Sequence, residues 1–210
     1  MGFPMKRMMI AGFAAGAAMM IGAALGAVSD RTVEPKPLVD AAGGVMNPMI
    51  AGQAMLPNRS LLENISASPE HTIFTAAVKE SGIADALKSN GQFTVFAPTN
   101  AALATLPARN LEQNKSELAR MMGYLVVPGR YDSAALLKAI GEGGGQAKLR
   151  TMEGGVLVAR MNGPTNLILM DEKGDTADIA IYDVYDKNGV MHVVDHMLQP
   201  GTVARQVASR

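Results

Sequence analysis

Apolar residues recur with the period of an α-helix over much of residues 59–140. The strongest such pattern predicts a helix over residues 116–125, with apolar positions at Leu118, Met121, Met122 and Leu125. Another helix is predicted to begin at Ser68-Pro69, because Ser is a favoured N-cap and Pro a favoured first helical residue, and to end near Gly82. A further helix is predicted from a Ser133 cap to Gly141. Aromatic and β-branched content predicts a strand at residues 93–96.

The last third of the chain has a different pattern. Strands are predicted at residues 147–152, 155–161, 166–171, 176–185 and 190–198. Between them lie dipeptides typical of tight hairpin turns: Glu153-Gly154, Asn162-Gly163, Lys173-Gly174 and Asn188-Gly189. Helices followed by a meander of strands predict a single α+β domain, with bounds of 59–200.

The N-terminal segment reads as a targeting sequence. Lys6 and Arg7 precede an uncharged run of small and apolar residues that reaches Ser29, a pattern typical of a secretory signal peptide over residues 1–29. The alternative is an uncleaved N-terminal anchor, since residues 8–28 are long enough to cross a bilayer. Either interpretation predicts an extracytoplasmic location: secreted, periplasmic or at the cell surface.

Two further segments flank the predicted domain. Residues 30–58 are expected to form a linker or lead-in, because Pro and Gly interrupt them and no helical or strand period persists. The apolar residues of its second half suggest packing against the domain. Residues 201–210 are expected to form a flexible tail.

Composition narrows the function classes. The 210 residues include 19 basic and 19 acidic ones, so the net charge is zero, which argues against a nucleic-acid-binding protein. Aromatic residues make up only 4 % of the chain, so base-stacking platforms are scarce. Cysteine is absent, which excludes disulfides, thiolate catalysis and cysteine-ligated metals.

Two sequence blocks resemble a known family. The first is Gly91-Gln92-Phe93-Thr94-Val95-Phe96-Ala97-Pro98-Thr99-Asn100-Ala101-Ala102-Leu103, and the second is Asn188-Gly189-Val190-Met191-His192-Val193-Val194-Asp195-His196-Met197-Leu198-Gln199-Pro200. Their order and spacing are similar to the signature blocks of the fasciclin (FAS1) domain. Residues 51–57 followed by 61–64 resemble the lead-in of its bacterial secreted single-domain members. The resemblance covers about residues 45–200. It implies a β-sheet wedge or sandwich with packed helices, in agreement with the α+β prediction.

The resemblance also suggests roles for individual residues. In many members a Tyr-His pair precedes the Val-Val-Pro-Gly stretch and is associated with adhesion; here the pair is Tyr124-Leu125. We therefore carry over only Tyr124 and Pro128 as interaction candidates, and expect Leu125 to be a core residue. The other family positions are expected to be structural: Phe93, Val95, Phe96, Pro98, Thr99, Asn100, His192, Val193 and Asp195.

No residue set predicts catalysis or a metal site. His192 and His196 would lie ~13 Å apart along one strand, which is too far for a shared metal. His192 alternates with valines and is expected to be a hydrogen-bonded core residue. The acidic segment 171–178 lacks calcium-loop spacing and is interpreted as a hairpin turn, and residues 141–145 lack the Lys-Ser/Thr of a phosphate loop. No serine-nucleophile elbow is present.

The absence of a catalytic residue set favours a non-enzymatic interaction module without cofactor or metal, and the resemblance to the fasciclin family implies that its role is adhesion between cells, to a matrix or in a biofilm. Its expected partner is a protein or a cell-surface or matrix component, with no nucleic acid, and with membrane contact only if the N-terminal segment is retained. The alternative is a periplasmic ligand-binding or envelope-stress protein without catalytic activity.

Overall fold

The computed structural model describes residues 44, 46–89, 91–105 and 114–201. The predicted signal peptide, the first half of the lead-in and nearly all of the predicted tail lie outside these residues. All described residues belong to one folded unit. Within them, no helix is both long and apolar enough to cross a bilayer.

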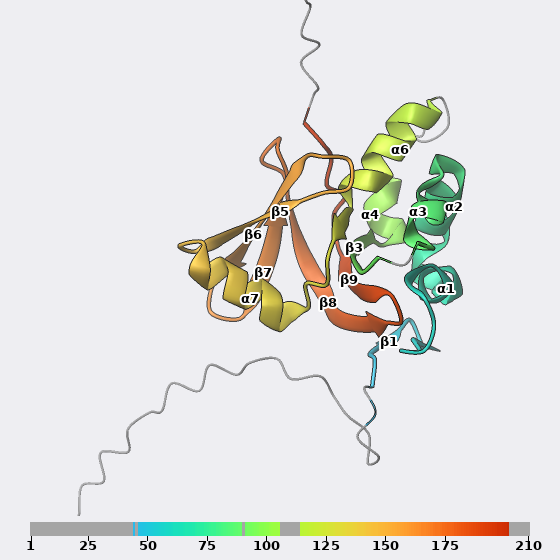
Figure 1. Ribbon diagram of the computed structural model, residues 1–210, viewed down its shortest axis with the longest axis horizontal. Helices are drawn as coiled ribbons and strands as arrows, with labels where there is room; N and C mark the ends of the chain where they lie inside the picture. Colours follow the sequence, from blue (N-terminus) through green and yellow to red (C-terminus); the bar gives the residue numbers. More distant parts are fainter. Residues whose placement is uncertain (1–43, 45, 90, 106–113, 202–210) are drawn as a thin grey trace, which may run out of the picture. The chain divides into compact units, whose positions relative to one another are not determined.

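The described strands form a small hairpin and one seven-stranded sheet, and helices occupy much of the rest (Figure 1). The strands are β1 (Met49–Ile50), β2 (Gln53–Ala54), β3 (Phe93–Pro98), β4 (Val126–Pro128), β5 (Gln146–Arg150), β6 (Val156–Asn162), β7 (Asn166–Met170), β8 (Thr176–Asp186) and β9 (Gly189–Val194). The helices are α1 (Leu61–Ala67), α2 (Thr72–Ser81), α3 (Ile83–Leu87), α4 (Asn100–Ala104), α6 (Lys115–Tyr124) and α7 (Ser133–Glu142), with a 3₁₀ turn at Pro69–His71. This confirms the predicted α+β class.

The large sheet has the order β4-β3-β9-β8-β7-β6-β5. Its one parallel pair is β3 with β9, so the two sequence blocks lie side by side on adjacent interior strands of the sheet. All other neighbouring strands in this sheet are antiparallel. Helices α1–α4 and α6 gather beside β3 and β9, whereas α7 packs against β5 and β6 (Figure 1).

The predicted hairpin turns connect β5 to β9 in order. Gly154, Gly163 and Gly174 each adopt a positive φ, which glycine adopts at little steric cost in a tight turn. The last strand is shorter than predicted. It ends at Val194 rather than residue 198, so His196 lies beyond the strand and is exposed.

The long strand β8 bends where its pairing shifts register against β9. Asp183 lies in the irregular segment with a φ of 57°, an unusual value for a residue with a side chain. Strand β7 pairs with the first residues of β8 only, while β9 pairs along much of its length. The bend therefore joins the β5–β7 part of the sheet to the β3–β9 part.

Helix starts differ in detail from the sequence predictions. Helix α7 is capped by Asp132, whose carboxylate accepts from the amide of Ala135, so Ser133 is the first helical residue and not the cap. The helix also continues past Gly141 to Glu142. The hydroxyl of Ser68 pairs with Nδ1 of His71, so it caps no amide, and a 3₁₀ turn precedes α2.

The lead-in contains a feature that the sequence analysis missed. Strands β1 and β2 form a short hairpin in residues 49–54, where no strand was predicted. The prediction that this half of the lead-in packs on the domain is confirmed, since Ile50 and Met55 belong to the core. The side chain of Asn47 also bonds to both backbone polar groups of Tyr185, at 2.7 Å each.

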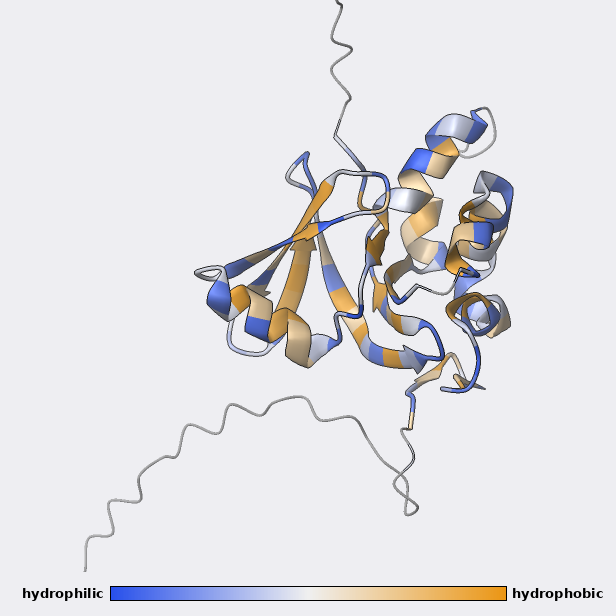
Figure 2. Ribbon diagram, viewed as in Figure 1, coloured by the Kyte–Doolittle hydropathy of each residue, from blue (hydrophilic) through white to orange (hydrophobic). Residues whose placement is uncertain are grey.

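The core lies between the helices and the inner faces of the strands. Apolar residues follow the strands, and polar residues occupy many of the turns (Figure 2). In β5 the alternation is complete, because Ala147 and Leu149 are buried while Gln146, Lys148 and Arg150 are exposed.

Candidate interaction surface

Tyr124 is the last residue of α6, and its side chain is fully buried. Its hydroxyl donates to the carbonyl oxygen of Val156 at 2.8 Å and accepts from the amide of Glu172 at 3.2 Å. Burial raises the pKa of Tyr124, so the phenol stays protonated. In this structure the ring presents no surface to a partner.

Pro128, the second interaction candidate, ends β4 and is exposed. It faces Phe93 of the neighbouring strand. Between the two candidates, Leu125 is completely buried in the core, which confirms the expectation for this position. The structure thus separates an internal Tyr124 from an accessible Pro128, and their interaction role stays a prediction.

The first sequence block supplies an interior strand of the sheet and a capped helix. Phe93, Val95 and Phe96 are buried in β3. The hydroxyl of Thr99 accepts from the amide of Ala102 and begins α4. The buried Thr94 hydroxyl donates to the carbonyl of Gly129 and accepts from the amide of Tyr131, each at 2.8 Å, a role that its position in an apolar strand did not reveal.

Asn100 links α4 to the start of α2. Its Oδ1 accepts from the amide of Ile73 at 3.0 Å and from the hydroxyl of Thr72 at 3.2 Å. Its Nδ2 donates to the carbonyl of Pro69 at 2.9 Å. Three bonds to a segment distant in sequence give this side chain a positioning role within the helical layer.

His192 lies in the core with both ring nitrogens engaged. Nδ1 accepts from the amide of Asp183 at 3.3 Å, and Nε2 lies 2.8 Å from the carbonyl oxygen of Tyr131, to which it donates. These partners correspond to the neutral tautomer with its proton on Nε2. The ring stacks on Phe96 with centroids 5.6 Å apart, and burial lowers the pKa of His192. Both nitrogens are therefore occupied by structural bonds.

Asp195 follows β9 and binds a neighbouring strand. Its Oδ1 accepts from the amide of Asp178 at 2.8 Å and lies 2.9 Å from Nδ1 of the exposed His196. Val193, one strand position earlier than the end of β9, is buried and lies opposite Ala97 of β3. These positions join β9 to its two neighbours.

The acidic segment forms a turn, as interpreted from sequence. Oδ1 of Asp171 accepts from the amides of Lys173 and Asp175, and its Oδ2 accepts from the amide of Gln199. Its oxygens thus bind the backbone. Across the described part of the chain, no group of three or more His, Asp or Glu residues could hold a metal ion.

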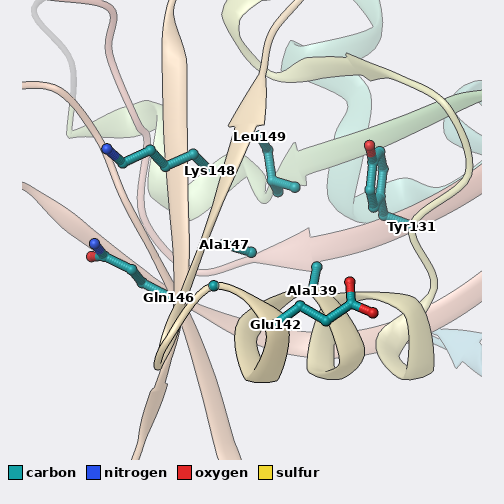
Figure 3. Close-up of a pocket in the computed structure, with 8 residues that line it drawn as sticks. Tyr131, Ala139, Glu142, Gln146, Ala147, Lys148 and Leu149 are labelled. Carbon is teal, nitrogen blue, oxygen red and sulfur yellow. The ribbon is translucent and has the colours of Figure 1, made fainter.

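The structure also contains a hollow of about 450 Å³ between α7 and the edge strand β5. Its lining includes Tyr131, Glu142, Gln146 and Leu149 (Figure 3). It forms where the chain turns from α7 into β5, a segment for which the sequence analysis predicted no binding role. Polar and apolar side chains share its lining.

Two asparagines position the lead-in and helices, and the sequence analysis did not assign them this role. Asn188 accepts from the amide of Leu61 at 2.9 Å and donates to the carbonyl of Leu87 at 2.6 Å. Asn64 is fully buried, bonds to both backbone groups of Leu56 and donates to the carboxylate of Asp186. In the sequence, Asn188 is visible only as a turn residue and a member of the second block, and nothing local indicates that Asn64 is buried.

Comparison with known proteins agrees with this architecture. The family model described as "Fasciclin domain" matches residues 69–200. The chain is 30 % identical over 157 residues to protein sll1483 of Synechocystis, covering 72 % of this chain and 79 % of that protein. It is 31 % identical over 154 residues to human periostin, covering 70 % of this chain but 16 % of periostin. The immunogenic protein MPB70 of Mycobacterium bovis is 31 % identical over 143 residues, which cover 64 % of this chain and 66 % of MPB70.

A solved structure shares the fold. It is the FAS1 domain pair of the insect cell adhesion molecule Fasciclin I, with a TM-score of 0.56 and 19 % identity. The match covers 68 % of this chain and 51 % of that structure, so this chain spans about half the length of the domain pair.

Proposed function

Because the chain belongs to the fasciclin domain family, we propose that it is an extracytoplasmic, non-enzymatic module that attaches cells to one another, to a matrix or to a surface. The observation that carries this proposal is the fold shared with a domain pair from an insect cell adhesion molecule. The N-terminal segment supports it, since a basic start followed by an apolar run is typical of exported proteins.

The hydrogen bonds of the two sequence blocks support a non-enzymatic role. A general base must be able to reach a substrate proton. The imidazole of His192 is buried and bonded on both nitrogens, and the amide of Asn100 is held by three bonds to α2 and its lead-in. These groups stabilise the fold and are not presented to a substrate.

The proposed partner is a protein or another component of a cell surface or matrix. Binding would use the exposed surface and need no cofactor. Tyr124 is buried, so an interaction at this corner of the molecule would involve Pro128 and its exposed neighbours.

The test is surface attachment of the host with and without the gene. Deletion is expected to reduce attachment, and complementation with the full chain is expected to restore it. A chain that lacks residues 1–29 serves as the control and should not rescue, because it would stay in the cytoplasm. Immunoblots of cell fractions establish that both chains accumulate to similar levels.

Unchanged attachment of the deletion strain, with the protein detected outside the cytoplasm, would contradict the adhesion proposal. The hollow between α7 and β5 would then favour the alternative function, which is ligand binding in the periplasm. A ligand that binds only the folded state raises the melting temperature, so a thermal-shift screen would identify it.

A further inference from the structure

Three cationic side chains lie together on the outer surface of the β5–β7 part of the sheet. Lys148 and Arg150 alternate along β5 with the buried Ala147 and Leu149, and are exposed. Figure 3 shows Lys148 pointing away from α7, on the side opposite to Leu149. Arg160 of β6 is exposed as well. We call Lys148, Arg150 and Arg160 the basic face.

Strand register places the three on the same side of the sheet. Gln146 lies opposite Arg160, Lys148 opposite Val158, and Arg150 opposite Val156. Paired residues on neighbouring strands point to the same face. Lys148 and Arg150 are thus separated by ~7 Å along the strand, and Arg160 is a diagonal neighbour of Lys148 at ~7–8 Å.

The charges of the basic face are not neutralised within the described residues. None of the three side chains makes a hydrogen bond or an ion pair there, and strands β5, β6 and β7 contain no Asp or Glu. On the same face, Asp178 lies two strands from Arg160, opposite Ile168, and its carboxylate accepts from Asn166. The carboxylate of Glu172 accepts from the amides of Val156 and Gly201 and forms no ion pair with the three cations.

We propose that the basic face binds an acidic polysaccharide, with its carboxylate or sulfate groups paired to Lys148, Arg150 and Arg160. The inference rests on the proposed attachment function and names the class of partner. A chain of repeated anionic groups can contact cations spread over a flat sheet and needs no deep pocket. Arginine can also bind such anions through two parallel N–H bonds.

The neighbouring side chains favour this partner over a membrane or an acidic protein. Val156, Val158 and Met170 on this face are half-buried, whereas the exposed large apolar residues Met46, Met49, Leu56 and Ile73 lie on other elements, so nothing protrudes here into a bilayer. Strands β5–β7 also contain no aromatic residue, and aromatic anchors dominate the centres of protein interfaces.

The test measures binding of the purified full chain to alginate, with neutral dextran as the reference polymer. A triple variant replaces the basic face with Lys148→Gln, Arg150→Gln and Arg160→Gln, since Gln146 shows that the exposed side of β5 accepts this side chain. The matched control is Lys79→Gln, Lys115→Gln and Lys187→Gln, which removes three exposed charges from other elements. Circular dichroism and melting curves establish that all three proteins are folded.

We expect the natural chain to bind alginate and not dextran, with an affinity that falls as salt is added. The basic-face variant should bind at least about tenfold more weakly, and the control variant should stay within about twofold of the natural chain. No binding of alginate by the natural chain, or equal losses in the two variants, would overturn the proposal.

Phosphatidylserine vesicles and poly-glutamate test whether the basic face binds a lipid surface or an acidic protein instead. Binding to vesicles that contain phosphatidylserine, or to poly-glutamate, with alginate inactive, would assign the face to lipid or to acidic protein and refute the polysaccharide. If deletion of the gene reduces attachment while alginate binding is absent, the attachment function stands and only the inference about its partner fails.

Discussion

Tyr124 and Val156 are joined by a 2.8 Å hydrogen bond from the phenol hydroxyl to the backbone carbonyl, which ties the end of α6 to the start of β6. Tyr124→Phe keeps the ring and removes this bond and the one from Glu172. The variant is expected to lower the free energy of unfolding by about 1–2 kcal/mol in urea denaturation.

Tyr131→Phe is the matched control for that measurement. Its hydroxyl makes no hydrogen bond within the described residues, since the bonds at Tyr131 involve its backbone. We expect a change below about 0.5 kcal/mol. Loss of attachment by a Tyr124→Phe variant of unchanged stability would instead give Tyr124 a direct binding role.

Asn100→Ala is expected to cost stability and not binding. The change removes two bonds accepted and one bond donated by the side chain, so the free energy of unfolding should fall by about 2 kcal/mol. Asn162→Ala, at an exposed position with no side-chain hydrogen bond in the described structure, should be nearly neutral. Weaker alginate binding by folded Asn100→Ala with an unchanged melting curve would contradict this assignment.

Because His71 is buried, we expect the free energy of unfolding to decrease in mild acid. Burial lowers its pKa to about 4, while the unfolded residue titrates near 6.5. Between these values the unfolded chain binds a proton that the folded chain does not, so the stability present above pH 6.5 decreases as the pH falls toward 4. The contribution is up to about 3 kcal/mol. Unfolding curves of the natural chain and His71→Gln at several pH values measure it, and parallel pH profiles would refute it.

The contribution of the buried Asp186 to stability is expected to change with pH in the opposite direction, decreasing as the pH rises. Burial raises the pKa of its carboxyl to about 7, and one carboxylate oxygen has no hydrogen-bond partner. The folded chain keeps a proton that the unfolded chain releases near 3.8, so this contribution is full below pH 3.8 and is lost as the pH rises to 7.

Asp186→Asn should therefore stabilise the protein at pH 8 by about 2 kcal/mol and have little effect near pH 4. Asp175→Asn removes an exposed carboxylate whose side chain makes no hydrogen bond in the described structure, and it serves as the control with a nearly unchanged free energy of unfolding. An Asp186→Asn variant that is less stable at pH 8 would show that the charged carboxylate is favourable where it lies.

Local features of the structure followed from the sequence, while long-range ones did not. The turns at Gly154, Gly163 and Gly174 need only a glycine between two apolar runs, so the strands on either side were found within a few residues. The hairpin β1–β2 was not predicted because its turn contains Ala51, which takes a φ of 47° although alanine rarely adopts positive φ. The pairing of β3 with β9 has no local signal, and the sequence analysis did not predict it.

The same contrast between local and long-range features holds for the candidate interaction residues. The burial of Leu125 followed from its place in a helical stripe, but that of Tyr124 depends on contacts with Val156 and Glu172, which are distant in sequence. The basic face arises from the register between β5 and β6, and no pattern within either strand specifies that register. Surfaces built from several strands are thus visible only once the sheet order is known.

The parallel pairing of β3 with β9 also restricts the order in which the protein can fold. Phe93 faces Gly189 across this pair, so an interior strand of the sheet is contributed by the last part of the domain to be synthesised. A nascent chain that has not reached Val194 lacks the strand that joins β3 to β8. Closing so long a segment is slow compared with forming hairpins, so we expect the β3–β9 pairing to form after the β5–β8 hairpins.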